Sequence, residues 1–191
     1  MGKIFITALL FFALSALHAQ KQPDTGPWKF HSINTVGLLV GQIGSAFQVQ
    51  TVNGLQHKSW FAGVGLGLDF YRFRGIPLFL DLRKEFGSSA NKFFLYGDAG
   101  AHFNWMTENQ KNNNLYTADG NVYNGFYSDA GIGYSIRLDN KTSWLLSAGY
   151  SYKTINETHT NFSPVAFDGP PSRTHDRYGL GRLTIKAGWK F

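Results

Sequence analysis

The chain has 191 residues, 22 glycines, no cysteine and a formal net charge of +6. Charged residues make up only 16% of it, against roughly 25% in soluble domains. The missing cysteines exclude disulfides, cysteine-based metal sites and thiol chemistry. As read from the sequence, the excess positive charge is spread along the chain without a basic stripe, so we expect no nucleic-acid partner.

Residues 1–19 have the pattern of a secretory signal peptide. A cationic start at Lys3 precedes a mostly apolar stretch over 4–17, and the small residue Ala19 offers a cleavage point. The stretch is shorter than the roughly 20 apolar residues that a membrane-spanning helix needs. We therefore expect export and cleavage.

After this segment, 20–29 is polar, holds two prolines and is predicted to be a periplasmic N-terminal arm. From residue 30 onward, apolar and polar residues alternate with period two between turn signals, which predicts strands in a single domain over 30–191. The eight predicted strands cover 30–41, 45–53, 57–71, 76–86, 92–105, 122–138, 142–155 and 176–191.

The predicted strands have two very different faces. In 122–138, one face carries Phe126, Ile132 and Ile136, while the other carries Asp129 and several glycines. Other strands repeat this division between an uncharged apolar face and a face that holds the charge. The pattern is typical of a transmembrane barrel with apolar residues outside and polar residues inside.

The connections between strands alternate in length. Short ones fall at Asn53-Gly54, 87–91 and 139–140, whereas the other set, at 42–44, 72–75, 106–121 and 155–175, includes both long connections. Membrane barrels have short periplasmic turns and longer extracellular loops. The sequence therefore predicts an all-β, eight-stranded antiparallel up-and-down transmembrane β-barrel. The N-terminal end of the first strand and the C-terminal end of the last strand are both expected on the periplasmic side.

The last strand alternates Leu183, Ile185, Ala187 and Trp189 on one face and ends on Phe191. This ending resembles the closing strand of bacterial outer-membrane barrels. The resemblance implies that Phe191 and Trp189 form an insertion signal read by the barrel-insertion machinery during biogenesis.

Residues 30–191 resemble the small eight-stranded outer-membrane barrels of Gram-negative bacteria, with the architecture of the OmpA membrane domain and OmpX. The segments WFAGVGLGLDFY (60–71) and IPLFLDLR (76–83) are similar to an outer-membrane barrel family of Bacteroidetes-type bacteria. The resemblance implies a monomer in outer-membrane lipid and supplies no catalytic residues, so we expect no enzymatic activity and no cofactor.

The interior of an eight-stranded barrel is just wide enough for side chains to fill it. Because unpaired buried charge is costly, we expect the inward charges to form an ion-pair network. Inward glycines are expected opposite large residues such as Phe79 and Phe94. The predicted network consists of Asp69, Asp81, Arg83, Glu85, Asp98, His102, Asp129, Arg137, Arg182 and Lys186.

The favoured function is a structural or interaction role through outer loops 106–121 and 155–175, with an unidentified extracellular or envelope protein as a possible partner. One alternative is a lipid-modifying barrel enzyme using His57 and Ser59 on one face of the third strand, although no orienting acid is evident. Others are a narrow channel for ions or small hydrophobic molecules, and a soluble lipocalin-like barrel with its faces reversed. No histidine spacing predicts a metal site.

Overall fold

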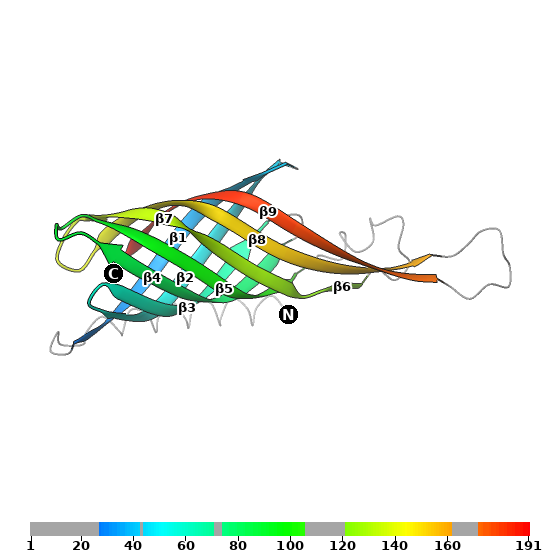
Figure 1. Ribbon diagram of the computed structural model, residues 1–191, viewed down its shortest axis with the longest axis horizontal. Helices are drawn as coiled ribbons and strands as arrows, with labels where there is room; N and C mark the ends of the chain where they lie inside the picture. Colours follow the sequence, from blue (N-terminus) through cyan, green and yellow to red (C-terminus); the bar gives the residue numbers. More distant parts are fainter. Residues whose placement is uncertain (1–26, 43, 71–73, 106–120, 162–171) are drawn as a thin grey trace, which may run out of the picture.

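The computed structural model describes residues 27–42, 44–70, 74–105, 121–161 and 172–191, and the regular structure among them is entirely β-strand (Figure 1). The predicted signal peptide, 106–120 and 162–171 lie outside the described residues. Within the described ranges, no helix is long and apolar enough to cross a membrane. The strands are β1 Trp28–Gly41, β2 Gly44–His57, β3 Trp60–Asp69, β4 Gly75–Phe86, β5 Lys92–Asn104, β6 Asn121–Tyr123, β7 Gly125–Arg137, β8 Ser143–Asn161 and β9 Ser172–Lys190.

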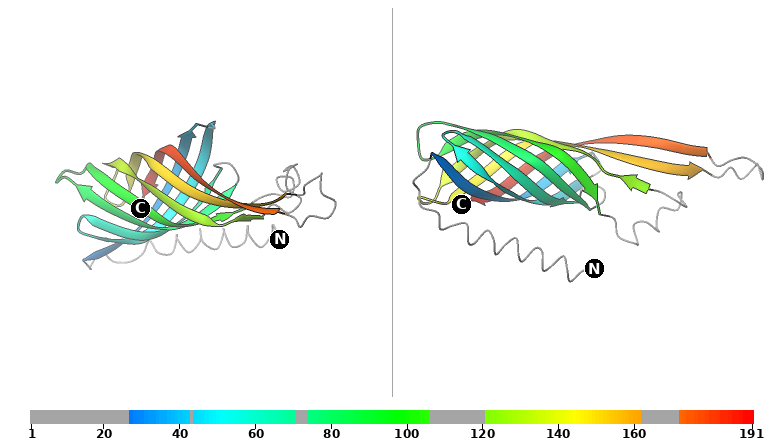
Figure 2. Two further views of the ribbon diagram at one scale, coloured as in Figure 1. Left: turned by 45° about the vertical axis from the view of Figure 1, so that its right-hand side comes forward. Right: turned by 90° about the horizontal axis from the view of Figure 1, so that it is seen from below.

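The strands close into a barrel because β1 pairs with β2 on one side and with β9 on the other (Figure 2). Val36 of β1, for example, lies opposite both Val49 and Ala187. The short β6 and the longer β7 are separated by Asn124, and both pair with β8, so together they form one interrupted barrel strand. The predicted closed, antiparallel, eight-stranded barrel is confirmed.

Exposure alternates along the strands, with apolar residues outside. On β4, Leu80 is 67% exposed, whereas its neighbours Phe79 and Asp81 are each 2% exposed. Charged groups are buried in the lumen while leucine, isoleucine and tryptophan cover the outer wall. These faces match the predicted membrane barrel, and the described strands do not show the reversed faces of a soluble lipocalin-like barrel.

Inward aromatic rings fill the lumen by packing into space that glycines leave open. A Cβ added at Gly65 would lie 2.3 Å from the Phe79 ring, and one at Gly133 would lie 2.2 Å from the Phe94 ring. Tyr96, Tyr127 and Phe61 extend the same buried cluster. Small residues therefore face large ones across the narrow interior, as predicted.

The predicted tight turn at Asn53-Gly54 is wrong. β2 continues through both residues to His57, and the turn consists of Lys58 and Ser59, with Lys58 at φ 56°. Gly54 instead lies opposite Gly63, where an added Cβ would lie 2.2 Å from the Ala62 carbonyl oxygen. The glycine at 54 permits close approach of two strands, because its continued pairing outweighs the local turn preference.

The predicted loop 155–175 is also largely wrong. β8 and β9 pair from Ser143↔Lys190 to Asn161↔Ser172, and this hairpin extends well beyond the barrel wall (Figure 1). Only 162–171 of the predicted loop lies outside the described residues. The β1–β9 pairing ends at Val40↔Leu183, so β9 leaves the wall near that level while its pairing with β8 continues.

Candidate functional site

The middle of the lumen contains three carboxylates on adjacent strands. Asp81 on β4 lies opposite Asp98 on β5, which lies opposite Asp129 on β7. All three are at most 4% exposed. The register therefore places three acids side by side in a barrel interior where charge must be balanced by nearby groups.

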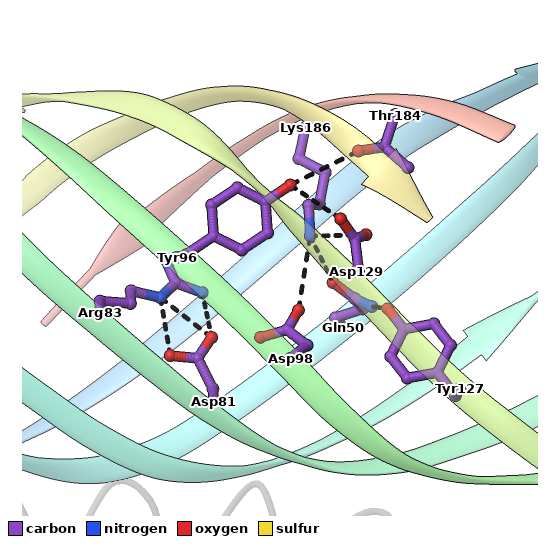
Figure 3. A network of polar contacts seen from close by, with 9 residues as sticks. All are labelled: Gln50, Asp81, Arg83, Tyr96, Asp98, Tyr127, Asp129, Thr184 and Lys186. Atoms are coloured by element: carbon purple, nitrogen blue, oxygen red, sulfur yellow. Dashed lines mark hydrogen bonds and ion pairs between the residues drawn. The ribbon is translucent and has the colours of Figure 1, made fainter. Parts of the chain in front are cut away.

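Two cations contact these carboxylates (Figure 3). Arg83 donates to Asp81 from Nε at 2.9 Å and from Nη2 at 2.7 Å, a fork geometry suited to a carboxylate. Lys186 Nζ donates to Asp129 Oδ2 at 3.0 Å and lies 3.7 Å from Asp98 Oδ2. Three carboxylates thus share two cations, and Asp98 has the longest ion-pair contact of the three.

Aromatic and amide groups complete this middle layer (Figure 3). The Tyr96 hydroxyl donates to Asp129 Oδ1 at 2.9 Å, and its ring lies 4.3 Å from Lys186 Nζ. Gln50 Nε2 donates to the Tyr127 hydroxyl at 2.7 Å. The charges are therefore packed between rings and amides that fill the centre of the barrel.

A second layer lies toward the end that carries the long connections. Lys153 on β8 pairs with Asp69 at the end of β3, and both are buried. Lys153 Nζ also lies 3.4 Å from His102 Nδ1 on β5. Arg182 on β9 donates from Nη1 to the Gly44 carbonyl oxygen at 3.2 Å, where β2 begins.

A third layer lies near the short turns and is centred on Glu85. Its carboxylate accepts from Lys190 at 2.7 Å, from Lys92 at 3.1 Å and from Gln56 at 3.2 Å. A cavity of about 10 Å³, at the lower limit for holding one water, adjoins this layer. It is lined by Ile33, Phe61, Arg83, Glu85, Phe94, Leu145 and Lys190.

The structure distributes the predicted network residues over these three layers, with one exception. Arg137 is exposed at the end of β7, where its backbone N–H donates to Asn91 Oδ1 at 3.0 Å. The other predicted residues lie in the lumen as Asp81, Arg83, Asp98, Asp129 and Lys186 in the middle layer, Asp69, His102 and Arg182 in the second, and Glu85 in the third.

Sequence reasoning missed several polar members of the layers. The inward position of Gln56 was not predicted, because the turn predicted at 53–54 left this residue outside any strand. Gln50 lies on a strand whose faces are indistinct in the sequence, although period-two counting from Gln48 places it inward. The hydroxyls of Tyr96 and Tyr127 were expected only as bulk, whereas they also donate or accept hydrogen bonds.

The C-terminal residue lies at the β1–β9 seam. Phe191 exchanges two backbone hydrogen bonds with Ser32, at 2.9 and 3.2 Å, and its carbonyl oxygen lies 2.8 Å from His31 Nδ1. The outer face beside it carries Trp189, which lies opposite Trp144. These contacts fix the end of the chain to the strand at which the barrel closes.

The residues considered for lipid chemistry do not share one strand. His57 ends β2 and Ser59 lies in the turn, so the predicted common face on the third strand is wrong. His57 Nδ1 contacts the Pro27 carbonyl oxygen at 3.1 Å, and its ring lies 4.6 Å from that of Trp28. Among the described residues, no group of three or more histidine and acidic side chains could hold a metal ion.

The fold and the lumen together define a class: an eight-stranded antiparallel barrel with an apolar outer wall and a closed, charged interior. The sequence matches no known protein-family model and no curated protein. Among solved structures, the chain is similar to the outer membrane protein OprG from Pseudomonas aeruginosa, with a TM-score of 0.55 and 13% identity over 85% of this chain and 95% of OprG. It is also similar to Neisserial surface protein A, with a TM-score of 0.52 and 12% identity over 86% of this chain and 96% of that protein.

At these identities the likeness establishes the fold of small outer-membrane β-barrels and nothing finer. The predicted architecture is therefore confirmed. The similarity to a Bacteroidetes-type family stays a prediction.

Proposed function

We propose that this protein is an integral outer-membrane barrel with a closed lumen that acts through its outward-projecting segments and not by catalysis. The observation that carries the proposal is the division of faces. Leu80, Ile132 and Ile185 are each more than 60% exposed on the outer wall, while the charged network is buried inside. Only an apolar solvent makes that arrangement favourable.

The lumen layers support a structural and not a conducting interior. Phe79 and Tyr127 rings lie 5.3 Å apart between centroids, and the ion pairs of the middle layer cross the interior beside them. A water-filled path would have to displace both rings and charges. We therefore infer that the interior stabilises the wall, and that purified protein in planar bilayers gives no steady conductance.

We propose that the β8–β9 hairpin is the segment that contacts a partner. This two-stranded ribbon extends past the barrel wall, and β6 pairs with it at Val122↔Glu157. Recognition segments on a rigid scaffold are a common use of such projections. Together with 106–120, which lies outside the described residues, the hairpin forms the interaction region that we propose.

Membrane fractionation combined with heat-modifiability on a gel tests this proposal. We expect outer-membrane recovery of the full-length protein with a heat-dependent mobility shift, since a closed barrel resists unfolding by detergent alone. Deleting Phe191, which we propose is read by the barrel-insertion machinery, should lower recovery of the inserted form. Soluble periplasmic recovery of both proteins would contradict the proposal.

A second candidate function is lateral passage of small hydrophobic molecules. It is favoured by one observation, an interruption in the β3–β4 ladder between Leu66↔Leu78 and Asp69↔Gly75. Pro77 lies in this gap and has no N–H to donate, which weakens the wall at that point. If the gap is a passage, Pro77→Val should slow uptake of a small alkane by cells that carry the protein in their outer membrane, whereas an unchanged rate at equal amounts of inserted protein would reject this candidate.

A further inference from the structure

The net positive charge of the chain is concentrated at one end of the barrel. The short-turn end carries seven cations and two acids, a group that we call the basic rim. It comprises Lys29, Lys58, Lys84, Lys92, Arg137, Lys141 and Lys190, with Glu85 and Asp139. Within 20–191, the remaining ten cations and ten acids cancel. These cations are spread along the sequence, as expected from the sequence alone, and the fold brings them to one end of the barrel.

Both carboxylates of the basic rim already accept hydrogen bonds within the protein. Glu85 accepts hydrogen bonds from Lys190 and Lys92 in the third layer of the lumen. Asp139 Oδ1 accepts from the backbone N–H groups of Lys141 and Thr142, at 2.7 and 2.8 Å. Among the described residues, Glu85 forms ion pairs with Lys92 and Lys190, and neither carboxylate forms one with Lys58, Lys84, Arg137 or Lys141.

Four rim cations are left for an external anion. Lys58, Arg137 and Lys141 are exposed, Lys84 is half-buried, and none of them has an ion pair within the described part of the chain. They lie on the β2–β3 turn, on β4, at the end of β7 and on the β7–β8 turn. Strand order places them in two groups on different parts of the barrel circumference, Lys58 with Lys84 beside β3 and Arg137 with Lys141 at the β7–β8 turn.

Lys84 links the rim to the membrane-facing wall. It lies opposite Trp60, and its Nζ is 4.8 Å from the centre of the Trp60 ring and 5.4 Å from that of Phe86. Both rings are exposed on the outer wall. Tryptophan is enriched at membrane interfaces, where a lysine can keep its stem among apolar groups and its amine at headgroup level.

The same level of the wall carries further aromatic pairs. Phe93 lies opposite both Phe86 and Tyr134, with 4.8 Å between the Phe93 and Tyr134 ring centroids. Trp144 lies opposite Trp189. An aromatic belt therefore accompanies the cations around the barrel, which is the geometry expected of a protein that contacts a surrounding leaflet.

We propose that the basic rim binds the headgroups of anionic phospholipids in the leaflet that surrounds the short-turn end. The inference rests on the proposed membrane insertion. A lipid leaflet fits better than a soluble acidic partner because the two groups of cations lie on different parts of the circumference and Lys84 lies within the aromatic belt. Each cation close to an anionic membrane surface contributes roughly fivefold to partitioning.

Electron paramagnetic resonance with spin-labelled lipids tests the proposal on full-length protein in phosphatidylcholine vesicles. We expect spin-labelled phosphatidylglycerol to associate with the barrel at least about twofold more strongly than spin-labelled phosphatidylcholine at low salt. The preference should fall toward one in 0.5 M salt, because screening weakens exposed charge pairs. It should also fall in K84Q/K141Q.

The matched control is R74Q/R177Q, which removes two cations from the other end and should leave the preference unchanged. Equal association of both lipids with an inserted, heat-modifiable barrel would overturn the inference alone, as would an equal loss in the control, and a soluble anionic partner would then be the better match for the rim. Failure of the wild-type protein to insert into vesicles would instead overturn the proposed function, and this inference with it.

Discussion

Asp98 is the residue on which the charge balance of the lumen depends. It lies between Asp81 and Asp129 in a layer that has only Arg83 and Lys186 as cations, and the Lys186–Asp98 distance of 3.7 Å is longer than the 3.0 Å to Asp129. An acid in excess of its counter-charges is costly to bury. The two outer carboxylates of this set therefore contribute differently from the central one.

We predict that Asp98→Asn leaves the free energy of unfolding unchanged or raises it, because the amide removes one unbalanced charge. Asp81→Asn should lower it by about 3 kcal/mol or more, because Arg83 loses its bidentate partner in a buried site. Urea unfolding of the protein refolded in vesicles measures both. Equal destabilisation by the two substitutions would contradict this account of the charge balance.

The packing of the lumen also depends on a single residue, Gly65. We predict that Gly65→Ala reduces the yield of folded barrel, since its Cβ would lie 2.3 Å from the Phe79 ring. Gly97→Ala is the matched control, because an added Cβ there meets no atom within 4 Å. The folded fraction by heat-modifiability is the readout, and equal yields of both variants would show that the ring can move aside.

The β7–β8 turn depends on one exposed carboxylate outside the membrane-spanning strands. The backbone N–H groups of Lys141 and Thr142 lower the pKa of Asp139 below its usual value of 3.8. A lowered pKa stabilises the fold above the ordinary pKa, and that contribution is lost as the pH falls through the lowered value. Asp139→Ala should therefore speed hydrogen exchange at both amides at neutral pH, and the difference from wild type should vanish in strong acid. Identical exchange at neutral pH would contradict this role.

The part of the β8–β9 hairpin that extends past the barrel wall lies in the interaction region that we propose. We predict that replacing 158–175 with a two-residue Asn-Gly turn, which keeps Glu157 opposite Asp176, preserves the heat-dependent mobility shift, because the closing β1–β9 pairs lie between Ile33↔Lys190 and Val40↔Leu183. Band shifts before and after heating measure this. Loss of the shift would mean that the extended ribbon is required for closure.

How far the sequence could predict these elements depended on the kind of signal. Alternation along β4 and β7 identified both faces, because period two is imposed by strand geometry and each face meets a different solvent. The Asn53-Gly54 signal failed because a local turn preference is weaker than continued pairing with β1 and β3 on both sides. The extension of β8 and β9 was not predicted. Outside the membrane a strand needs no apolar face, so residues 155–175 lack the period-two alternation that indicates a strand.

The site was less predictable than the fold. Inward parity placed Asp81, Asp98 and Asp129 in the lumen, but which acid faces which cation depends on the inter-strand register. Register follows from pairing across distant parts of the chain, as between Lys186 on β9 and Asp129 on β7, and no local pattern encodes it. The concentration of charge at the basic rim was missed for the same reason, because cations far apart in sequence meet only when the barrel closes.

The membrane barrel requires that lipid surround its outer wall. The chain contains no cysteine, so one nitroxide can be attached at a single introduced cysteine without background labelling. Leu80 is suited to this because it is 67% exposed on the lipid-facing side of β4. With Leu80→Cys labelled and the protein in vesicles, we predict that the nitroxide relaxes strongly with oxygen and weakly with a water-soluble nickel complex. The opposite pattern at this position would place the outer wall in water and contradict the membrane barrel.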